Sequence, residues 1–209
     1  MKKTFITLFI LLSIALILPV YAQIGTRFPS ERKVVKDPVT GVELVFLTSS
    51  QSGDRKIYPT HNQWTSDGEW VIFTSQRVVG EAMAVNEKTG DIVQVTEGGY
   101  SGMLSVARKS MKLYFMRRPD APRGVPVAVE VVEVDLKKLF ADSESGNLKP
   151  VSAYERICGV TPPEMGAGGD MALDGGEEWV WFRVGKEESL KYLPEGTEIS
   201  RPFGRYFND

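Results

Sequence analysis

The polar segment at residues 58–63 carries the side chains of this sequence that are best suited to acid–base and sugar chemistry. Its His61 is the only histidine among 209 residues, and an imidazole titrates near neutral pH, which suits a proton-transfer group. Three neighbours add hydroxyl and amide groups that can hydrogen-bond to sugar hydroxyls, namely Tyr58, Asn62 and Gln63. A lone histidine is more often hydrogen-bonded for structural reasons than functional, so both interpretations of His61 stay open.

Three arginines could provide the positive charge that recognises an acidic ligand. Arg77, Arg117 and Arg118 follow strand-like runs at comparable places in two sequence repeats. A guanidinium pairs with a carboxylate through two parallel hydrogen bonds, and this geometry fits an anionic uronate sugar. The simpler alternative is that these charges are solvated groups at the ends of strands.

The sequence contains no recognisable metal-binding or nucleophilic constellation. With one histidine there is no histidine cluster at ligand spacing, so no metal ligand is predicted. Cys158 is the only cysteine and has no partner for an intramolecular disulfide; a buried, inert thiol is the simplest interpretation. No Gly-x-Ser-x-Gly motif or Ser/His/Asp set appears, and the glycines at 162–169 lack the strand-to-helix context of a phosphate-binding loop.

The candidate residues lie within a repeat whose clearest copy is residues 64–75, Trp-Thr-Ser-Asp-Gly-Glu-Trp-Val-Ile-Phe-Thr-Ser. Its Asp-Gly turn joins two strand-like runs, as in a β-hairpin. Two further copies place Phe115 and Phe182 where the first has Phe73, at spacings of 42 and 67 residues. The first spacing is typical of one four-stranded propeller blade, and the second equals that length plus an insertion.

The repeat predicts an all-β fold, a partial β-propeller of about two and a half four-stranded antiparallel blades. Residues 42–48 would be the outer strand of a preceding blade, and a Thr-Gly or Ser-Gly pair precedes each outer strand. We expect Phe73, Phe115 and Phe182 to occupy equivalent buried sites on one face of the second strands. The predicted blades are blade one at about 58–96, blade two at about 103–152 and a partial blade three at about 169–209.

Within these blades the pattern also predicts individual elements. Blade one has strands near 58–64, 69–75, 82–86 and 91–95. Blade two has a long third strand at 127–135, a helical turn at 136–140 and an outer strand at 148–152. Blade three has strands at 169–173 and 178–184, and then a short helix or loop at 186–192.

Residues 1–22 have the pattern of a secretory signal peptide. Lys2 and Lys3 precede an apolar run that is too short for a comfortable membrane span, and Val20 and Ala22 are small residues suited to cleavage. An uncleaved N-terminal anchor is the alternative. We therefore expect a periplasmic or secreted protein whose incomplete propeller domain occupies 23–209, with no stable membrane association after cleavage. We also expect residues 1–22 not to pack against the blades.

The charge of the chain limits its partners. It has 25 basic and 27 acidic residues, for a net charge of −2. A basic footprint for nucleic acid is therefore absent, and no nucleic-acid partner is expected.

The repeat at 65–75 resembles that of TolB-type propellers. The order of three motifs along the chain gives a more specific resemblance than the repeat alone. The motifs are Asp-Pro-Val-Thr-Gly at 37–41, Tyr-Pro-Thr-His-Asn-Gln-Trp-Thr-Ser-Asp-Gly at 58–68, and Glu-Lys-Thr-Gly at 87–90. In this order they resemble the beginning of the oligogalacturonate lyase family, seven-bladed propeller enzymes of pectin breakdown. The resemblance covers about residues 27–118 well and the rest loosely.

The resemblance implies β-elimination in short galacturonate oligomers. In the family a histidine base removes a proton, and a divalent metal, usually manganese, neutralises the uronate carboxylate. That base and the mostly histidine ligands lie in later blades, so no catalytic or metal-binding residue is carried over to this sequence.

The sequence therefore leaves two alternative functions, one related to an enzyme and one of a binding protein. The first is an oligogalacturonate lyase-like protein, present as an N-terminal fragment that is inactive alone, because a propeller needs about four to eight blades to close its ring. The second is a non-catalytic TolB-like propeller that binds a protein or glycan in the periplasm. Ring closure by association ranks lower, and the oligomeric state stays open.

Overall fold

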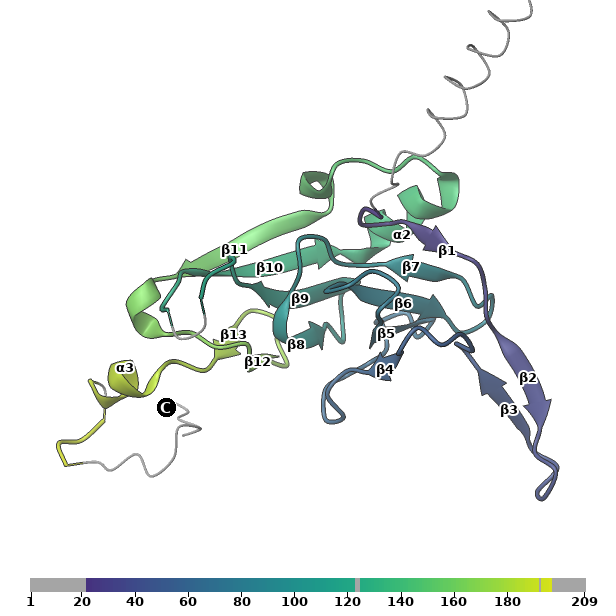
Figure 1. The fold of residues 1–209 in the computed structure, drawn as a ribbon, viewed down its shortest axis with the longest axis horizontal. Coiled ribbons are helices and arrows are strands. Elements are labelled where there is room, and N and C mark those ends of the chain that lie inside the picture. Colours follow the sequence, from purple (N-terminus) through teal and green to yellow (C-terminus); the bar gives the residue numbers. More distant parts are fainter. Residues whose placement is uncertain (1–21, 123–124, 192, 197–209) are drawn as a thin grey trace, which may run out of the picture.

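The structure, a computed structural model, describes residues 22–122, 125–191 and 193–196 (Figure 1). Its strands form two large antiparallel sheets and two smaller two-stranded ones, with few helices. A mostly β, propeller-like architecture of antiparallel sheets is thus confirmed. The predicted signal peptide falls outside the described residues, apart from Ala22.

The first large sheet has the strand order β1-β7-β6-β5-β4. Its strands β5 (Trp70–Thr74), β6 (Ala82–Asn86) and β7 (Ile92–Gln94) lie where the repeat predicts them. The outer edge differs, because β1 (Arg27–Phe28) pairs with β7 as a fifth strand that no sequence pattern indicated. At the inner edge, β4 (Arg55–Lys56) pairs with the end of β5.

The inner edge of this sheet is interrupted where a continuous strand at 58–64 was predicted. Only Trp64 pairs there, in an isolated bridge with Val71. Ahead of it the backbone forms a turn in which the His61 N–H donates to the Tyr58 carbonyl at 3.0 Å. The prediction of a strand over this segment is wrong, and Pro59 provides the reason, because it has no N–H to donate to a ladder.

The second large sheet has the order β11-β10-β9-β8. Strands β8 (Ser101–Val106), β9 (Lys112–Arg117) and β10 (Val129–Asp135) agree with the predicted blade two. The outer strand does not, because β11 (Glu155–Thr161) replaces the strand predicted at 148–152. That segment instead enters a 3-10 turn at Val151–Ala153, preceded by Pro150.

Strand β11 is an edge strand whose central residues are exposed on both faces, and this changes the expectation for Cys158. The thiol was expected to be buried, but Cys158 is exposed on β11. Partial burial nevertheless raises the pKa of the Cys158 thiol. The thiol is therefore accessible without being activated as a thiolate.

A helix, α2 (Leu136–Ser145), joins β10 to β11 and is longer than the predicted helical turn. The Asp135 side chain caps its N-terminus by accepting from the Lys138 N–H, and Gly146 ends it in the left-handed conformation. Phe140 of this helix stacks on Trp70 of β5 at 4.0 Å between ring centroids. The helix thus closes one end of the contact between the two large sheets (Figure 1).

The remaining elements lie on either side of the large sheets. Strands β12 and β13 form a third, two-stranded sheet that contacts β8, and a short helix follows it as predicted. The β2–β3 hairpin projects away from the first sheet (Figure 1). The bounds are β2 (Lys33–Lys36), β3 (Glu43–Phe46), β12 (Met171–Leu173), β13 (Val180–Phe182) and α3 (Lys186–Leu190), with a 3-10 turn at Pro163–Met165.

The three repeat phenylalanines lie on the same face of their sheets. Phe73 packs in a cluster with Leu47, on the side of the first sheet away from the second. Phe115 faces the first sheet, and Phe182 packs against the cluster that faces the second sheet. Phe73 and Phe115 are buried as predicted, whereas Phe182 is half-buried.

A close backbone contact joins the second and third sheets at Gly102. The residue has φ +76°, and a Cβ there would lie 2.1 Å from the Gly169 carbonyl oxygen. The Met103 N–H donates to the same carbonyl at 2.7 Å. Only glycine therefore permits both the backbone conformation and this approach.

We expect Gly102→Ala to lower the free energy of unfolding by about 2 kcal/mol or more, because it adds left-handed strain to a backbone clash. Urea unfolding followed by tryptophan fluorescence measures the loss. Gly80→Ala is the matched control, since Gly80 has φ +86° but no atom within 4 Å of the added Cβ. Equal losses in the two variants would contradict the importance of the Gly102–Gly169 contact.

Candidate functional site

Two adjoining cavities lie along the inner edges of the three successive sheets, where β4, β8 and β12 are the first strands. The first, here named the His61 cavity, has a volume of about 270 Å³. The second, named the Tyr58 cavity, has a volume of about 330 Å³. The first half of β8 lines the Tyr58 cavity and the second half lines the His61 cavity, so the two follow one another along the same strand.

The lining residues come from separate parts of the chain. The His61 cavity is lined by the turn after β4, the end of β8 and the segment after β12, including Thr60, His61, Asn62, Ser105, Asp174 and Glu177. The Tyr58 cavity is lined by β4, the start of the same turn and the start of β8, including Lys56, Tyr58, Thr74, Tyr100, Met103 and Leu104.

The predicted polar segment forms the wall between the cavities. His61 Nδ1 lies 3.2 Å from the Leu104 carbonyl oxygen, and the ring of Tyr58 meets the imidazole edge-on at 5.5 Å. The Asn62 amide donates to the Trp64 carbonyl at 2.6 Å. These contacts fasten the turn to β8 and orient the imidazole. Among the described residues, Nε2 of His61 has no hydrogen-bond partner.

Gln63 contributes through its backbone. Its carbonyl accepts from the Ile72 N–H at 2.8 Å, which continues the interrupted inner strand. Gln63 is not among the residues that line either cavity. The structure therefore brings Tyr58, His61 and Asn62 to the cavities but not Gln63.

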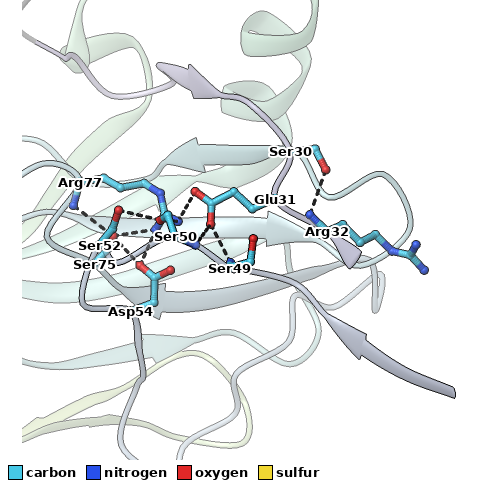
Figure 2. A network of polar contacts seen from close by, with 9 residues as sticks. All are labelled: Ser30, Glu31, Arg32, Ser49, Ser50, Ser52, Asp54, Ser75 and Arg77. Carbon is cyan, nitrogen blue, oxygen red and sulfur yellow. Dashed lines mark hydrogen bonds and ion pairs between the residues drawn. The ribbon is translucent and has the colours of Figure 1, made fainter. Parts of the chain in front are cut away.

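Arg77 lies in a network of carboxylates and hydroxyls rather than in a cavity (Figure 2). Its guanidinium pairs with Glu31 at 2.7 Å and also with Asp54. Ser50 and Ser75 accept further hydrogen bonds from it. Both carboxylates belong to this chain, so Arg77 is already neutralised.

The Glu31 carboxylate shows how strong this network is. Burial alone would raise its pKa, but hydrogen bonds from Arg77 and from the backbone N–H groups of Ser49 and Ser50 outweigh burial and lower the pKa to about 2. Only the ionised carboxylate accepts all of these bonds. Glu31 thus holds the segment before β4 against the end of β5.

Arg117 is likewise bound within the chain. Its guanidinium contacts Glu155 at 2.6 Å and Glu130 at 3.5 Å, and it donates to the Glu97 carbonyl at 2.6 Å. Arg118 is exposed and donates to the Val125 carbonyl at 2.8 Å. The predicted set of three ligand-binding arginines is therefore not assembled at the two cavities.

Two other cations line the cavities, and the sequence reasoning missed both. Lys56 lines the Tyr58 cavity and Arg108 lines the His61 cavity. Neither forms an ion pair with any residue that the structure describes. Their positions at the ends of inner-strand segments could have identified them as candidates for ligand binding, since inner strands line the central channel of a propeller.

The fold is similar to that of solved oligogalacturonate lyases. An oligogalacturonate lyase in complex with manganese superposes with a TM-score of 0.53 at 17% identity, over 74% of this chain and 35% of that one. The enzyme from Vibrio parahaemolyticus gives a TM-score of 0.53 at 16% identity, over 73% of this chain and 35% of that one. The chain therefore spans about a third of the length of the lyases it matches.

The comparisons define the class of fold. No protein-family model matches the sequence, and no curated protein matches it. At these identities the structural likeness establishes a fold shared with the oligogalacturonate lyase propellers, and it agrees with the resemblance found in the motifs.

The residues described here do not fit the manganese ion that the resemblance implies. No group of three or more histidine, cysteine or acidic residues in the described parts of the chain could hold a metal. The cavity carboxylates are also engaged. Asp174 accepts from the N–H groups of Gly176, Glu178 and Trp179, and Glu177 accepts from Lys109 and Ser110.

Within the described ranges, no helix is long and apolar enough to cross a membrane.

We expect Glu31→Gln to lower the free energy of unfolding at pH 7 by about 1–2 kcal/mol, a value kept small because the carboxylate is partly exposed. A depressed pKa stabilises the fold above the ordinary pKa of 4.5, and this stabilisation is lost as the pH falls through about 2. The difference between variant and wild type should therefore shrink between pH 4.5 and 2. Urea unfolding at several pH values measures it.

The matched control is Glu144→Gln, which removes the same charge from an exposed position on α2. This variant should behave like the wild type at every pH. If Glu31→Gln were equally neutral, the network in Figure 2 would contribute nothing to stability.

Proposed function

We propose that this chain belongs to an oligogalacturonate lyase-like protein of pectin breakdown and binds short galacturonate oligomers along its inner edge. The single observation that carries the proposal is the structural likeness to two such lyases over about three quarters of the chain. The inner-edge cavities support it, because the larger falls within the range of about 300–1,000 Å³ typical of small-molecule sites.

The residues of the His61 cavity suit sugar binding more than catalysis. Asn62 and Ser105 offer amide and hydroxyl groups, and Arg108 offers a guanidinium that forms no ion pair with the acidic residues the structure describes. Elimination next to a uronate needs a base and neutralisation of the carboxylate acting together. The sequence has a single histidine, which cannot be both the base and the histidine ligands implied by the resemblance.

The second candidate is a non-catalytic propeller that binds a glycan or a protein in the periplasm. The engagement of Asp174 and Glu177 with backbone N–H groups favours it, because these carboxylates shape the cavity and are not free for chemistry. Export, either to the periplasm or out of the cell, is part of both candidates and rests on the pattern of residues 1–22. The first candidate expects galacturonate binding at the inner edge, whereas the second expects either a glycan or a protein there.

We expect the chain to bind digalacturonate and Arg108→Gln to weaken this binding about threefold, since an exposed ion pair contributes about 0.2–1 kcal/mol. Isothermal titration calorimetry measures the affinity. Arg118→Gln is the matched control, because it removes the same charge from an arginine that does not line either cavity. Absence of any galacturonate binding by the wild-type chain would refute the proposed function.

We also expect no sustained lyase turnover by this chain, because its single histidine cannot act as the base and also supply the metal ligands. The chain is incubated with trigalacturonate and manganese, and unsaturated product is followed by ultraviolet absorbance against a protein-free control. Turnover that is abolished by His61→Ala would show that a complete catalytic site lies within these residues.

A further inference from the structure

Of the predicted site residues, Tyr58 lines the Tyr58 cavity, but the other residues of its lining were not predicted. Its lining combines one cation, Lys56, with two tyrosines, Tyr58 and Tyr100. We propose that this cavity is the subsite that recognises the carboxylate-bearing ring of an acidic sugar, with Lys56 contacting the carboxylate and the tyrosines contacting the ring. The inference deepens the proposed function and rests on it.

The distribution of charge favours the Tyr58 cavity for the carboxylate. Lys56 is the charged residue of its lining, and no acidic side chain lines it. The His61 cavity contains Arg108 together with Asp174 and Glu177. In the His61 cavity these two carboxylates offset the attraction of Arg108 for a sugar carboxylate, whereas in the Tyr58 cavity the attraction of Lys56 is not opposed in this way.

Lys56 is also free to contact a ligand. It is exposed, and it forms no ion pair with the parts of the chain that the structure describes. Its neighbour on the same strand, Arg55, lies on the opposite face by the alternation of β4 and does not line either cavity. Of these two neighbouring cations, only Lys56 is therefore placed to contact a ligand in the Tyr58 cavity.

The tyrosines provide an apolar surface with polar tips. Tyr58 is 44% exposed, so much of its side chain remains accessible to a ligand. Tyr100 is half-buried, and burial with the nearby Glu81 carboxylate raises its pKa, which keeps its hydroxyl protonated as a donor. Aromatic residues that combine an apolar body with a polar tip suit the contact with a sugar ring.

The two cavities adjoin at a boundary that a short oligomer could cross. Leu104 lines one and Ser105 the other, and the same division falls between Pro59 and Thr60 on the turn after β4. A ligand of two or more rings could place one carboxylate beside Lys56 and hydroxyls in the His61 cavity. The geometry therefore points to recognition of acidic oligomers rather than of neutral ones.

The experiment compares digalacturonate with its fully methyl-esterified counterpart, which has nearly the same shape but no charge. Affinities of the full chain are measured by titration calorimetry for wild type, Lys56→Gln, Lys56→Arg and Arg55→Gln. We expect Lys56→Gln to weaken digalacturonate binding about fivefold and to leave binding of the ester unchanged. Lys56→Arg should retain most of the affinity, and Arg55→Gln should bind like the wild type.

The possible failures are distinguishable. If Lys56→Gln binds digalacturonate like Arg55→Gln while Arg108→Gln still weakens it, the proposed function stands and the Tyr58 subsite is wrong. Equal losses for the acid and the ester would also overturn the inference, because Lys56 would then not act on the carboxylate. If wild type binds neither ligand, both proposals fail. Unchanged melting temperatures confirm that the exposed substitutions leave the fold intact.

Discussion

The stability of the two large sheets depends on burial of apolar side chains on both faces of each sheet. Successive side chains of the central strands point to opposite faces, so apolar residues reach both. On β5, Trp70 and Ile72 enter the core between the two large sheets, whereas Phe73 enters a separate cluster on the other side. All five residues of the adjacent β6 are buried. Each large apolar side chain that is fully buried contributes about 1.5–3 kcal/mol, so the contact between sheets is the main source of stability. The β2–β3 hairpin shows the contrast, since Val34 and Phe46 stay nearly half exposed where the described chain provides no covering sheet.

Packing within the chain also determines the partners of the arginines. Where segments of the chain pack together, charged groups lose contact with water and need partners, because a charge left without its partner is destabilising. Arg77 with Glu31, and Arg117 with Glu155, meet this requirement within the chain. They connect segments that are distant in sequence but adjacent in the fold. At the inner edge, by contrast, the exposed cations Lys56 and Arg108 form no ion pair within the described ranges, so positive charge has different surroundings in the framework and in the candidate site.

The elements that sequence reasoning predicted well are those with their own local signal. Strands β5, β6 and β7 alternate or run apolar between recognisable turns, and the repeat spacing fixed their order. The outer strand predicted at 148–152 is wrong, because Pro150 has no N–H for a ladder and precedes a 3-10 turn, and the adjacent Leu148 packs beside Gly25. Likewise Arg77 was predicted to pair with the carboxylate of a ligand, whereas its guanidinium pairs with Glu31, a glutamate 46 residues away in the same chain. His61 lies in a turn after β4 and not in the predicted strand, and its contact with the Leu104 carbonyl depends on β8, a strand of the next sheet.

The energetics of the inner edge set limits on what it can recognise. An exposed lysine–carboxylate pair contributes at most about 1 kcal/mol, so Lys56 alone cannot give tight binding. The polar groups of the His61 cavity add little more, because Asn62 and Asp174 already have hydrogen bonds that a ligand would only replace. Affinity must therefore be distributed over several weak contacts along β8. A single ring can make only part of them, whereas a linked oligomer makes the second set at a high effective concentration. Under the proposed function, this distribution favours acidic oligomers over acidic monosaccharides, and it needs no deeply buried charge in the site.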